Sequence, residues 1–460
     1  MLKFSSKPVA EHAEVPLADE GRLEEIVAHW STRGAAAALD ADATGKPCYV
    51  ASVGAERDTR ARDAQLAEIV SLVESQGDRV VGREICHLAA PNPRTLLGRG
   101  AAEEIAARAR AAGATMLVLD AELSPSQTRN LEDVAGIPIC DREAVILNVF
   151  LRHARTRRAR IQVEIAQLEY LRPRIRGVGL DMDQQTGGMS RARGPGETAS
   201  ELLARKLDGR LEELSKALRK IGTSSRTQRA RRDACKRAVL VGYTNAGKTS
   251  LMNALTAAGL SARDVPFETL DTTSRCLTRH GGDVLLSDTV GVIRRLPPRL
   301  LASFESTLTE IHDATLLVFV VDVGDHERAL HVDETRALVD RMGAGDVPRL
   351  FVFNKADRLV VPPSTRELDR LAGGDPWVLV SSRDPAATAA LEHAILRAAR
   401  AGEEDVEIVV PYGAARALAL VYARCRVVGS DATDEGLRLR VQAAPAVLEQ
   451  VRARLEEATQ

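Results

Sequence analysis

Short apolar runs alternate with segments of helical apolar spacing along much of the chain, and this alternation predicts an α/β architecture. From Ala64 to Glu74, apolar residues recur every three or four positions, as on the buried face of a helix. Apolar runs between such segments favour buried strands in a mostly parallel sheet. Up to residue 150, the expected strands are 49–53, 79–86, 114–119 and 138–140, and the expected helices are 64–74, 101–111 and those that begin near Ser124 and Arg142.

Two long amphipathic helices are expected after this first domain. The helix Arg152–Tyr170 carries Ile161, Ile165 and Leu168 on one face, and Ser200–Ile221 repeats leucine or isoleucine at every third or fourth position. Helices with such apolar seams, joined by a polar loop, predict an antiparallel pair that packs like a coiled coil.

The same stretch of the chain is strongly basic. Residues 152–237 hold 22 Lys and Arg against 10 Asp and Glu, and two of the arginines, Arg191 and Arg193, lie in the connecting loop 187–198. A solvated charged surface is the usual role of such helices. A concentrated basic hairpin with a basic tip also suits phosphate contacts with folded RNA, and we predict that role here.

A phosphate-binding loop begins the second half of the chain. The segment Gly242–Thr249 fits G-x-x-x-x-G-K-S/T, follows an apolar strand and precedes a helix. In such a P-loop, several backbone N–H groups face one phosphate, and the helix N-terminus adds partial positive charge. Lys248 is expected to reach the β- and γ-phosphates, and the Thr249 hydroxyl to bind Mg²⁺. An ordinary glycine-rich turn is the alternative, and the motifs described next argue against it.

Two further motifs follow apolar strands. Asp288–Gly291 has the form D-x-x-G, in which Asp288 serves the Mg²⁺ shell and the Gly291 N–H senses the γ-phosphate. Asn354–Asp357 has the form N-K-x-D, whose terminal carboxylate can accept hydrogen bonds from the ring N–H and the amino group of guanine. Adenine would leave that carboxylate unpaired, and such mismatches are strongly rejected. The motifs together predict a guanine-nucleotide site.

Hydrolysis depends on the segments that flank these motifs. Phe267–Thr273 is the expected first switch, in which Thr269, or alternatively Thr273, would complete the Mg²⁺ shell. Val292 follows Gly291 at the position where Ras-like proteins place a water-orienting glutamine. An apolar side chain cannot orient water, so we expect slow unaided turnover and a helper. Asn245 resembles the asparagine of GTPases that use K⁺, and backbone capping is its alternative role.

Composition excludes several other classes of protein. Aromatic residues make up 3% of the chain, so stacking on bases is not expected to be the main nucleic-acid contact. The six cysteines form no C-x-x-C pair, which indicates neither a zinc site nor a disulfide framework. No apolar run reaches transmembrane length. We expect a cytoplasmic monomer without membrane insertion, with peripheral membrane association as an alternative.

Several segments together resemble the HflX family of ribosome-associated GTPases. They are the P-loop GYTNAGKT, the D-x-x-G run DTVGVIRRLP, the loop run RGPGET, and the upstream LLGRG and ELSPSQTRNLED. The resemblance spans nearly the whole chain after about residue 48. It implies a GTP-hydrolysing protein that binds the large ribosomal subunit and ribosomal RNA, splits or rescues stalled ribosomes under stress, and hydrolyses GTP faster on the ribosome.

Two other functions stay open at the level of sequence. One is a GTPase that acts on free RNA or in tRNA modification, with dimerisation completing the site. The other is a GTP-sensing scaffold with little hydrolysis, which Val292 makes physically reasonable.

The expected fold is a doubly wound P-loop GTPase sheet, preceded by an N-terminal α/β domain and a basic antiparallel helical hairpin and followed by a small α+β domain. The expected boundaries are 1–47 for a poorly defined segment, then 48–150, 151–233, 234–403 and 404–460. The candidate catalytic residues are Lys248, Thr269 and Gly291, and the candidate Mg²⁺ ligands are Thr249 and Thr269. The candidate nucleotide-binding residues are Gly242, Tyr243, Thr244, Asn245, Ala246, Gly247, Lys248, Thr249, Phe267, Glu268, Thr269, Leu270, Asp271, Asp288, Thr289, Val290, Gly291, Asn354, Lys355, Asp357, Ser381 and Ser382.

Overall fold

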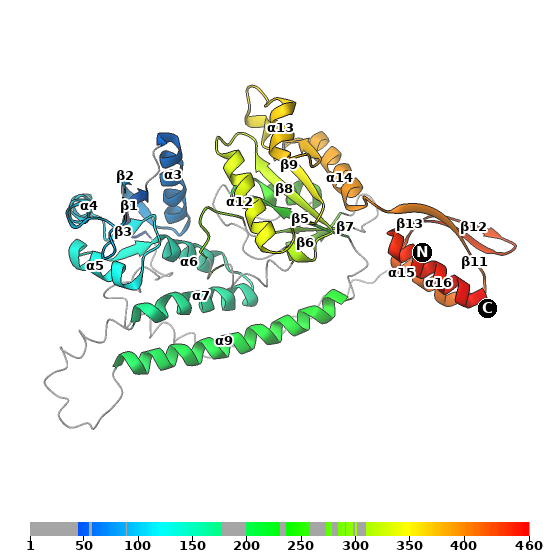
Figure 1. Ribbon diagram of the computed structural model, residues 1–460, viewed down its shortest axis with the longest axis horizontal. Helices are drawn as coiled ribbons and strands as arrows, with labels where there is room; N and C mark the ends of the chain where they lie inside the picture. Colours follow the sequence, from blue (N-terminus) through cyan, green and yellow to red (C-terminus); the bar gives the residue numbers. More distant parts are fainter. Residues whose placement is uncertain are drawn as a thin grey trace.

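The computed structural model describes residues 45–54, 58–88, 90–175, 199–230, 236–256, 273–277, 284–289, 291–297, 300 and 310–459. The first-switch residues Phe267–Asp271, together with Val290, Arg191 and Arg193, lie outside the described residues. The described part contains three sheets arranged along the length of the molecule, with the long helix α9 running beside the first two (Figure 1).

The N-terminal domain (residues 47–153) is a parallel sheet with helices on both faces. Its strands, in the spatial order β2-β1-β3-β4, are β1 (Pro47–Gly54), β2 (Arg79–His87), β3 (Met116–Leu119) and β4 (Ile139–Asp141). Buried residues of α3 (Thr59–Ser75) and α6 (Arg142–His153) cover one face, and those of α4 (Arg99–Ala111) and α5 (Pro125–Ala135) cover the other. Ser124 caps α5 through reciprocal hydrogen bonds with Gln127. The alternation expected from the sequence is confirmed here.

Helices α7 (Arg157–Ile175) and α9 (Ala199–Ala230) pack against each other through an apolar seam that includes Ile161, Leu168 and Leu207. The single helix expected over Arg152–Tyr170 is wrong, because α6 ends at His153 and α7 begins at Arg157. Thr156 explains the break, since its hydroxyl accepts a hydrogen bond from the Ala159 N–H at 3.2 Å and so caps the new helix. Helix α9 also continues well beyond Ile221.

The G domain is a six-stranded mixed sheet in the order β10-β9-β8-β5-β7-β6, parallel except for β6. Its strands are β5 (Lys236–Val241), β6 (Thr273–Cys276), β7 (Val284–Asp288), β8 (Leu316–Asp322), β9 (Arg349–Asn354) and β10 (Trp377–Leu379). One face is covered by α10 (Lys248–Thr256) and α14 (Pro385–Ala399), and the other by α12 (Arg328–Arg341) and α13 (Thr365–Ala372). The carboxyl ends of β5, β7 and β9 therefore bring the predicted motifs to one edge of the sheet.

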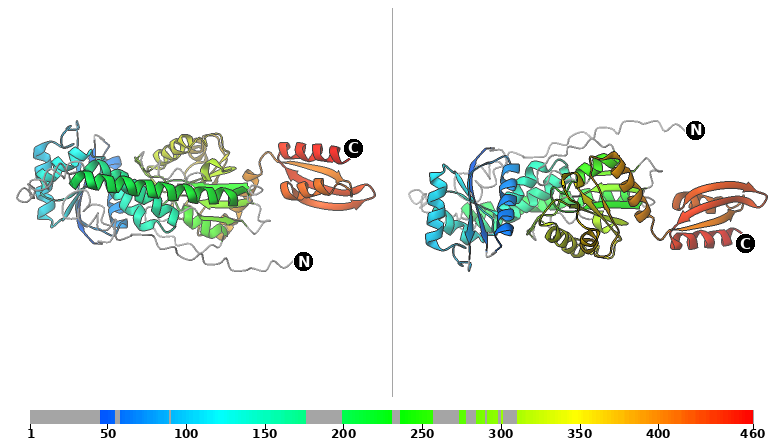
Figure 2. Two further views of the ribbon diagram at one scale, coloured as in Figure 1. Left: turned by 90° about the horizontal axis from the view of Figure 1, so that it is seen from below. Right: turned by 90° about the horizontal axis from the view of Figure 1, so that it is seen from above.

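A small antiparallel sheet ends the chain, beyond the G domain (Figure 2). Its strands, in the order β11-β13-β12, are β11 (Glu404–Val410), β12 (Arg426–Thr433) and β13 (Gly436–Ala443). Buried residues of α15 (Ala415–Arg424) and α16 (Pro445–Thr459) join those of the strands in one apolar cluster. The sequence did not predict β12, whose residues are largely exposed.

Among the residues that the structure describes, no helix combines the length and the apolar character that crossing a membrane requires.

Candidate functional site

Lys248 is the first residue of α10, at the end of the P-loop that joins β5 to this helix. Its Nζ donates hydrogen bonds to the backbone carbonyls of Gly242 at 3.1 Å and Tyr243 at 2.9 Å. The side chain is buried, and burial lowers the pKa of Lys248 to about 8, against the opposing effect of Asp288. An anion at the ammonium group would favour its charged form again. These contacts hold the ammonium where a bound phosphate would meet it.

The P-loop and the N-K-x-D motif are directly linked. Asn354 Nδ2 donates to the carbonyl of Ala246 at 3.0 Å, and Lys355 Nζ donates to the carbonyl of Asn245 at 2.6 Å. A Cβ added to Gly247 would lie 2.3 Å from Asn354 Nδ2, so the close approach of the two motifs requires glycine there. The phosphate loop and the expected base-binding motif thus form one hydrogen-bonded unit.

The Asp357 carboxylate is held by the segment that follows β10. Ser381 Oγ donates to Asp357 Oδ1 at 2.8 Å, and Arg383 Nη1 donates to Oδ2 at 3.3 Å. The hydrogen bond from Ser381 keeps the pKa of Asp357 below its usual range. Nearby, the Ser382 N–H donates to Asn354 Oδ1 at 3.2 Å. The carboxylate is therefore charged and held in place by two donors.

Thr249 and Asp288 bring two oxygen ligands together at the start of α10. Thr249 Oγ1 donates to Asp288 Oδ2 at 2.7 Å, and Asp288 is fully buried at the end of β7. A hydroxyl and a carboxylate are the hard oxygen ligands that Mg²⁺ prefers, so these residues fit that ion. Thr273, the alternative first-switch ligand, begins β6 directly opposite Asp288 in the strand register. The residue after Asp288 is Thr289, whose hydroxyl donates to the Leu240 carbonyl at 2.7 Å.

The D-x-x-G segment lies directly against the P-loop. The Thr244 N–H donates to the Val292 carbonyl at 2.8 Å, and the Val292 N–H donates to the Gly242 carbonyl at 3.0 Å. A Cβ on Gly291 would lie 2.7 Å from Thr244 Cγ2 and 3.2 Å from Lys248 Nζ. Glycine is thus needed beside the ammonium that would bind a phosphate.

The Val292 side chain has a structural role. It is 6% exposed and forms a small apolar cluster with Tyr243 and Leu338. Because this side chain packs between the P-loop and α12, it anchors the D-x-x-G segment. The sequence showed that Val292 could not orient water, but its anchoring role became visible only in the fold.

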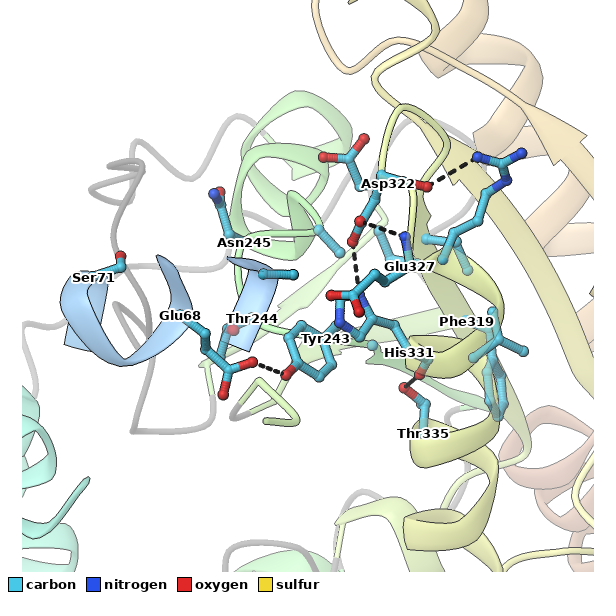
Figure 3. A pocket seen from close by; sticks show the side chains of 18 of the residues that line it. Glu68, Ser71, Tyr243, Thr244, Asn245, Phe319, Asp322, Glu327, His331 and Thr335 are labelled. Atoms are coloured by element: carbon cyan, nitrogen blue, oxygen red, sulfur yellow. Dashed lines mark hydrogen bonds and ion pairs between the residues drawn. The ribbon is translucent and has the colours of Figure 1, made fainter. Parts of the chain in front are cut away.

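A cavity of about 350 Å³ adjoins the P-loop on the side of the N-terminal domain (Figure 3). The P-loop residues 242–246, the helix α12 and the end of β8 line it on one side, and Glu68 and Ser71 of α3 line it on the other. This cavity is therefore lined by residues of two domains.

Comparisons with known proteins agree with this geometry. Three family models match in chain order: "GTP-binding GTPase N-terminal" at residues 63–151, "GTP-binding GTPase Middle Region" at 153–232, and "50S ribosome-binding GTPase" at 237–355. A protein of Spirochaeta thermophila, named GTPase HflX, is 38% identical over 395 residues, which cover 84% of this chain and 94% of the relative. The chain belongs to the HflX family of GTPases. The resemblance seen in the sequence is confirmed.

Further proteins named GTPase HflX, and one solved GTP-binding protein, match different shares of the chain. GTPase HflX of Gluconacetobacter diazotrophicus is 36% identical over 86% of this chain and 95% of its own, and that of Escherichia coli is 38% identical over 64% and 70%. A solved GTP-binding protein of Sulfolobus solfataricus in complex with GDP is 21% identical, with a TM-score of 0.42 over 76% of this chain and 98% of its own. As a member of the HflX family, the chain is a GTPase that binds and hydrolyses GTP.

Two contacts at the HflX nucleotide site were not found from the sequence. Asp322, at the end of β8, pairs with Lys355 Nζ at 2.9 Å and so fixes the lysine of the N-K-x-D motif. An acidic residue at the end of an apolar strand is a signal that could have indicated it. The Tyr243 hydroxyl donates to Glu68 of the N-terminal domain, a contact across 175 residues that no local pattern predicts.

Proposed function

We propose that this GTPase binds the large ribosomal subunit and its RNA, and that it splits or rescues stalled ribosomes under stress. Support comes from the GTPase motifs, from the matching family model described as a 50S ribosome-binding GTPase, and from the basic hairpin. In this proposal GTP orders the switches for docking, and hydrolysis lowers the affinity and permits release. We propose the domain boundaries 48–150 for the N-terminal domain, 151–233 for the hairpin, 234–403 for the G domain and 404–460 for the C-terminal domain.

We propose that the basic hairpin, which includes α7 and α9, contacts RNA. Arg205, Lys206, Arg219 and Lys220 lie along the same helix, α9, whose apolar residues pack on α7. All four side chains are exposed, so phosphate oxygens can reach them. Arg191 and Arg193, in the sequence that connects α7 to α9, add two positive charges to this hairpin. Binding through such contacts weakens steeply as salt is added, which gives the proposal a direct test.

Within the nucleotide site, we assign each motif a role. The P-loop and Lys248 would hold the phosphates, Asp357 would recognise guanine, and the Gly291 N–H would meet the γ-phosphate. Thr249, with Thr269 from the first switch, would hold Mg²⁺, which neutralises charge on the phosphates when bound. Because Val292 is anchored in an apolar cluster, the group that orients water has to come from elsewhere.

The first experiment is GTP hydrolysis by the purified protein with and without purified large ribosomal subunits, in potassium buffer. We expect turnover to rise at least about tenfold with subunits, since each 1.4 kcal/mol of added transition-state stabilisation is tenfold in rate. The double variant Arg191→Glu/Arg193→Glu should lose most of this stimulation while its GDP affinity stays unchanged. The variant Glu103→Gln/Glu104→Gln, on the exposed face of α4, is the control for a change of surface charge away from the hairpin.

The alternatives predict different outcomes. Tight GTP binding with no response to subunits, but with turnover raised by free tRNA, would favour RNA modification. Low activity under every condition would favour a GTP-sensing scaffold. Loss of GDP affinity in the arginine variant would instead mean that the protein as a whole was damaged.

A role of K⁺ can be tested at Asn245 without disturbing the backbone. This residue has a φ of 60°, a left-handed conformation in which asparagine is common and glycine is free of strain. If the side chain serves a K⁺ ion, replacing K⁺ with Na⁺ should slow turnover about tenfold, and Asn245→Gly should remove this difference. If asparagine serves the backbone conformation alone, the glycine variant should keep both the rate and its dependence on the ion.

A further inference from the structure

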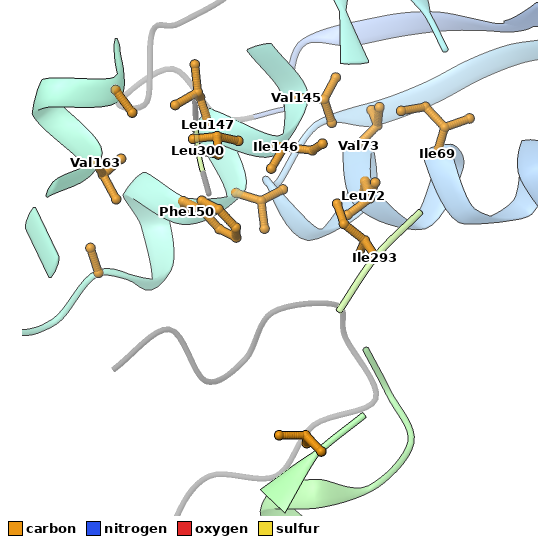
Figure 4. Close-up of a cluster of buried hydrophobic side chains, with 14 of the residues drawn as sticks. Ile69, Leu72, Val73, Val145, Ile146, Leu147, Phe150, Val163, Ile293 and Leu300 are labelled. Atoms are coloured by element: carbon orange, nitrogen blue, oxygen red, sulfur yellow. The ribbon is translucent and has the colours of Figure 1, made fainter. Parts of the chain in front are cut away.

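The segment that follows D-x-x-G is packed against the N-terminal domain. Ile293 is 2% exposed and belongs to one buried apolar cluster with Leu72 of α3 and Phe150 of α6 (Figure 4). Leu300, further along the segment, is buried in the same cluster. The part of the G domain that should respond to the γ-phosphate is therefore in apolar contact with two helices of another domain.

Polar contacts from both domains fix the backbone of Arg294, the residue after Ile293. The Arg294 N–H donates to the Tyr243 hydroxyl at 2.9 Å, and the Arg294 carbonyl accepts from Arg142 Nη2 at 2.9 Å. Tyr243 belongs to the P-loop, whereas Arg142 begins α6 of the N-terminal domain. One peptide segment thus bridges the phosphate loop and the neighbouring domain.

Glu68 of α3 closes this arrangement. Its carboxylate accepts a hydrogen bond from the Tyr243 hydroxyl through one oxygen (Figure 3). The other oxygen pairs with Arg142. Arg142 is 3% exposed and also donates to Asp120 at 2.5 Å. The Tyr243 ring stacks on His331 of α12, with centroids 3.5 Å apart. Every member of this group is therefore held by more than one neighbour.

We propose that Glu68, Arg142 and Tyr243 form an interdomain clamp on Arg294 that positions Gly291 for GTP hydrolysis. The inference rests on the GTPase activity of the chain and does not depend on its ribosomal partner. Glu68 and Arg142 act here as positioning residues that belong to a different domain from the nucleotide. Tyr243 links Glu68 to the P-loop, because it is itself a P-loop residue.

The clamp matters because Val292 supplies no side chain for the reaction. Gly291 lies three residues before Arg294, and Val292 between them is hydrogen-bonded to the P-loop on both its N–H and its carbonyl. With the segment fixed at 292 and 294, the Gly291 N–H can keep one orientation toward a γ-phosphate. Pre-oriented donors contribute to catalysis because they need no reorganisation when charge develops.

The test uses conservative variants of the full-length protein. Tyr243→Phe keeps the stacked ring and removes the hydroxyl, and Glu68→Gln keeps the shape and removes the charge. Each should lower kcat about tenfold at saturating GTP, the effect of losing one hydrogen bond to a charged group. The affinity for GDP should change less than about twofold, because the Tyr243 hydroxyl and the Glu68 carboxylate bond to Arg294 and Arg142 rather than to Lys248 or Asp357. Ser71→Ala, on the same cavity wall, and Glu104→Gln, on the outer face of α4, are the matched controls.

The double variant distinguishes a clamp from two unrelated defects. If the residues act as one unit, Glu68→Gln/Tyr243→Phe should be no slower than the slower single variant, because the contact is already lost. Thermal unfolding midpoints and GDP affinities test whether each variant is folded. Unchanged kcat in both single variants, multiplicative losses in the double variant, or a parallel loss of GDP affinity would each overturn the proposal.

Discussion

Asparagine in place of Asp357 is expected to change the nucleotide preference of the protein from GTP to xanthosine triphosphate. Guanine presents a ring N–H and an amino group, which a carboxylate can accept together. An amide offers one acceptor and one donor. Its N–H₂ donor meets the amino group of guanine, which is also a donor, whereas xanthine has a carbonyl acceptor at that position. Because a site built around specific hydrogen bonds rejects a mismatched partner, GTP affinity should fall by a factor on the order of 10⁴.

The measurement is competition of GTP and xanthosine triphosphate against a fluorescent guanine or xanthine nucleotide. Ser381 donates to Asp357 at 2.8 Å and can equally donate to the amide oxygen of asparagine, so the local structure should persist. Asp333→Asn, on the exposed face of α12, removes the same charge away from the site. Retention of wild-type GTP affinity by Asp357→Asn would show that guanine is recognised elsewhere.

Lys248→Ala is expected to abolish useful binding of both GTP and GDP. The wild-type ammonium is buried and donates to the carbonyls of Gly242 and Tyr243, so alanine removes a positive charge from the interior of the P-loop. Loss of charge-assisted bonds to phosphate should weaken binding about a hundredfold or more. Titration with fluorescent GDP measures the loss directly.

The control for this variant is Lys216→Ala, which removes an exposed ammonium on α9 that pairs with Glu212. It should leave nucleotide binding unchanged. The P-loop assignment would be wrong if Lys248→Ala bound GDP as tightly as the wild-type protein while remaining folded.

Local sequence was sufficient for the elements that carry the nucleotide motifs. Gly247, Asn354 and Asp288 follow or end strands whose apolar runs are continuous, and each lies where its motif predicts. The break between α6 and α7 was missed because helical spacing continues through it, and Thr156 outweighs that spacing by capping a new helix. Strand β12 was missed because its exposed residues give no apolar alternation.

The interdomain contacts could not be predicted for a different reason. Glu68 and Arg142 look like ordinary helix residues, and nothing in the sequence relates them to Tyr243 or Arg294. Their pairing depends on how the two domains are packed, since Arg142 and Arg294 are 152 positions apart in the sequence. Val292 illustrates the same limit, since its sequence position indicated a missing catalytic group while its packing explains why a valine stands there.

Helix α9 has a mechanical consequence. Its 32 residues make a rod about 48 Å long at 1.5 Å per residue, and the strand that leads into the P-loop begins at Lys236, shortly after the rod ends. A rotation of about 5° around that end would sweep the opposite end through about 4 Å. A small rotation at the P-loop end of α9 would thus become, at the far end of the helix, a displacement larger than the length of a hydrogen bond.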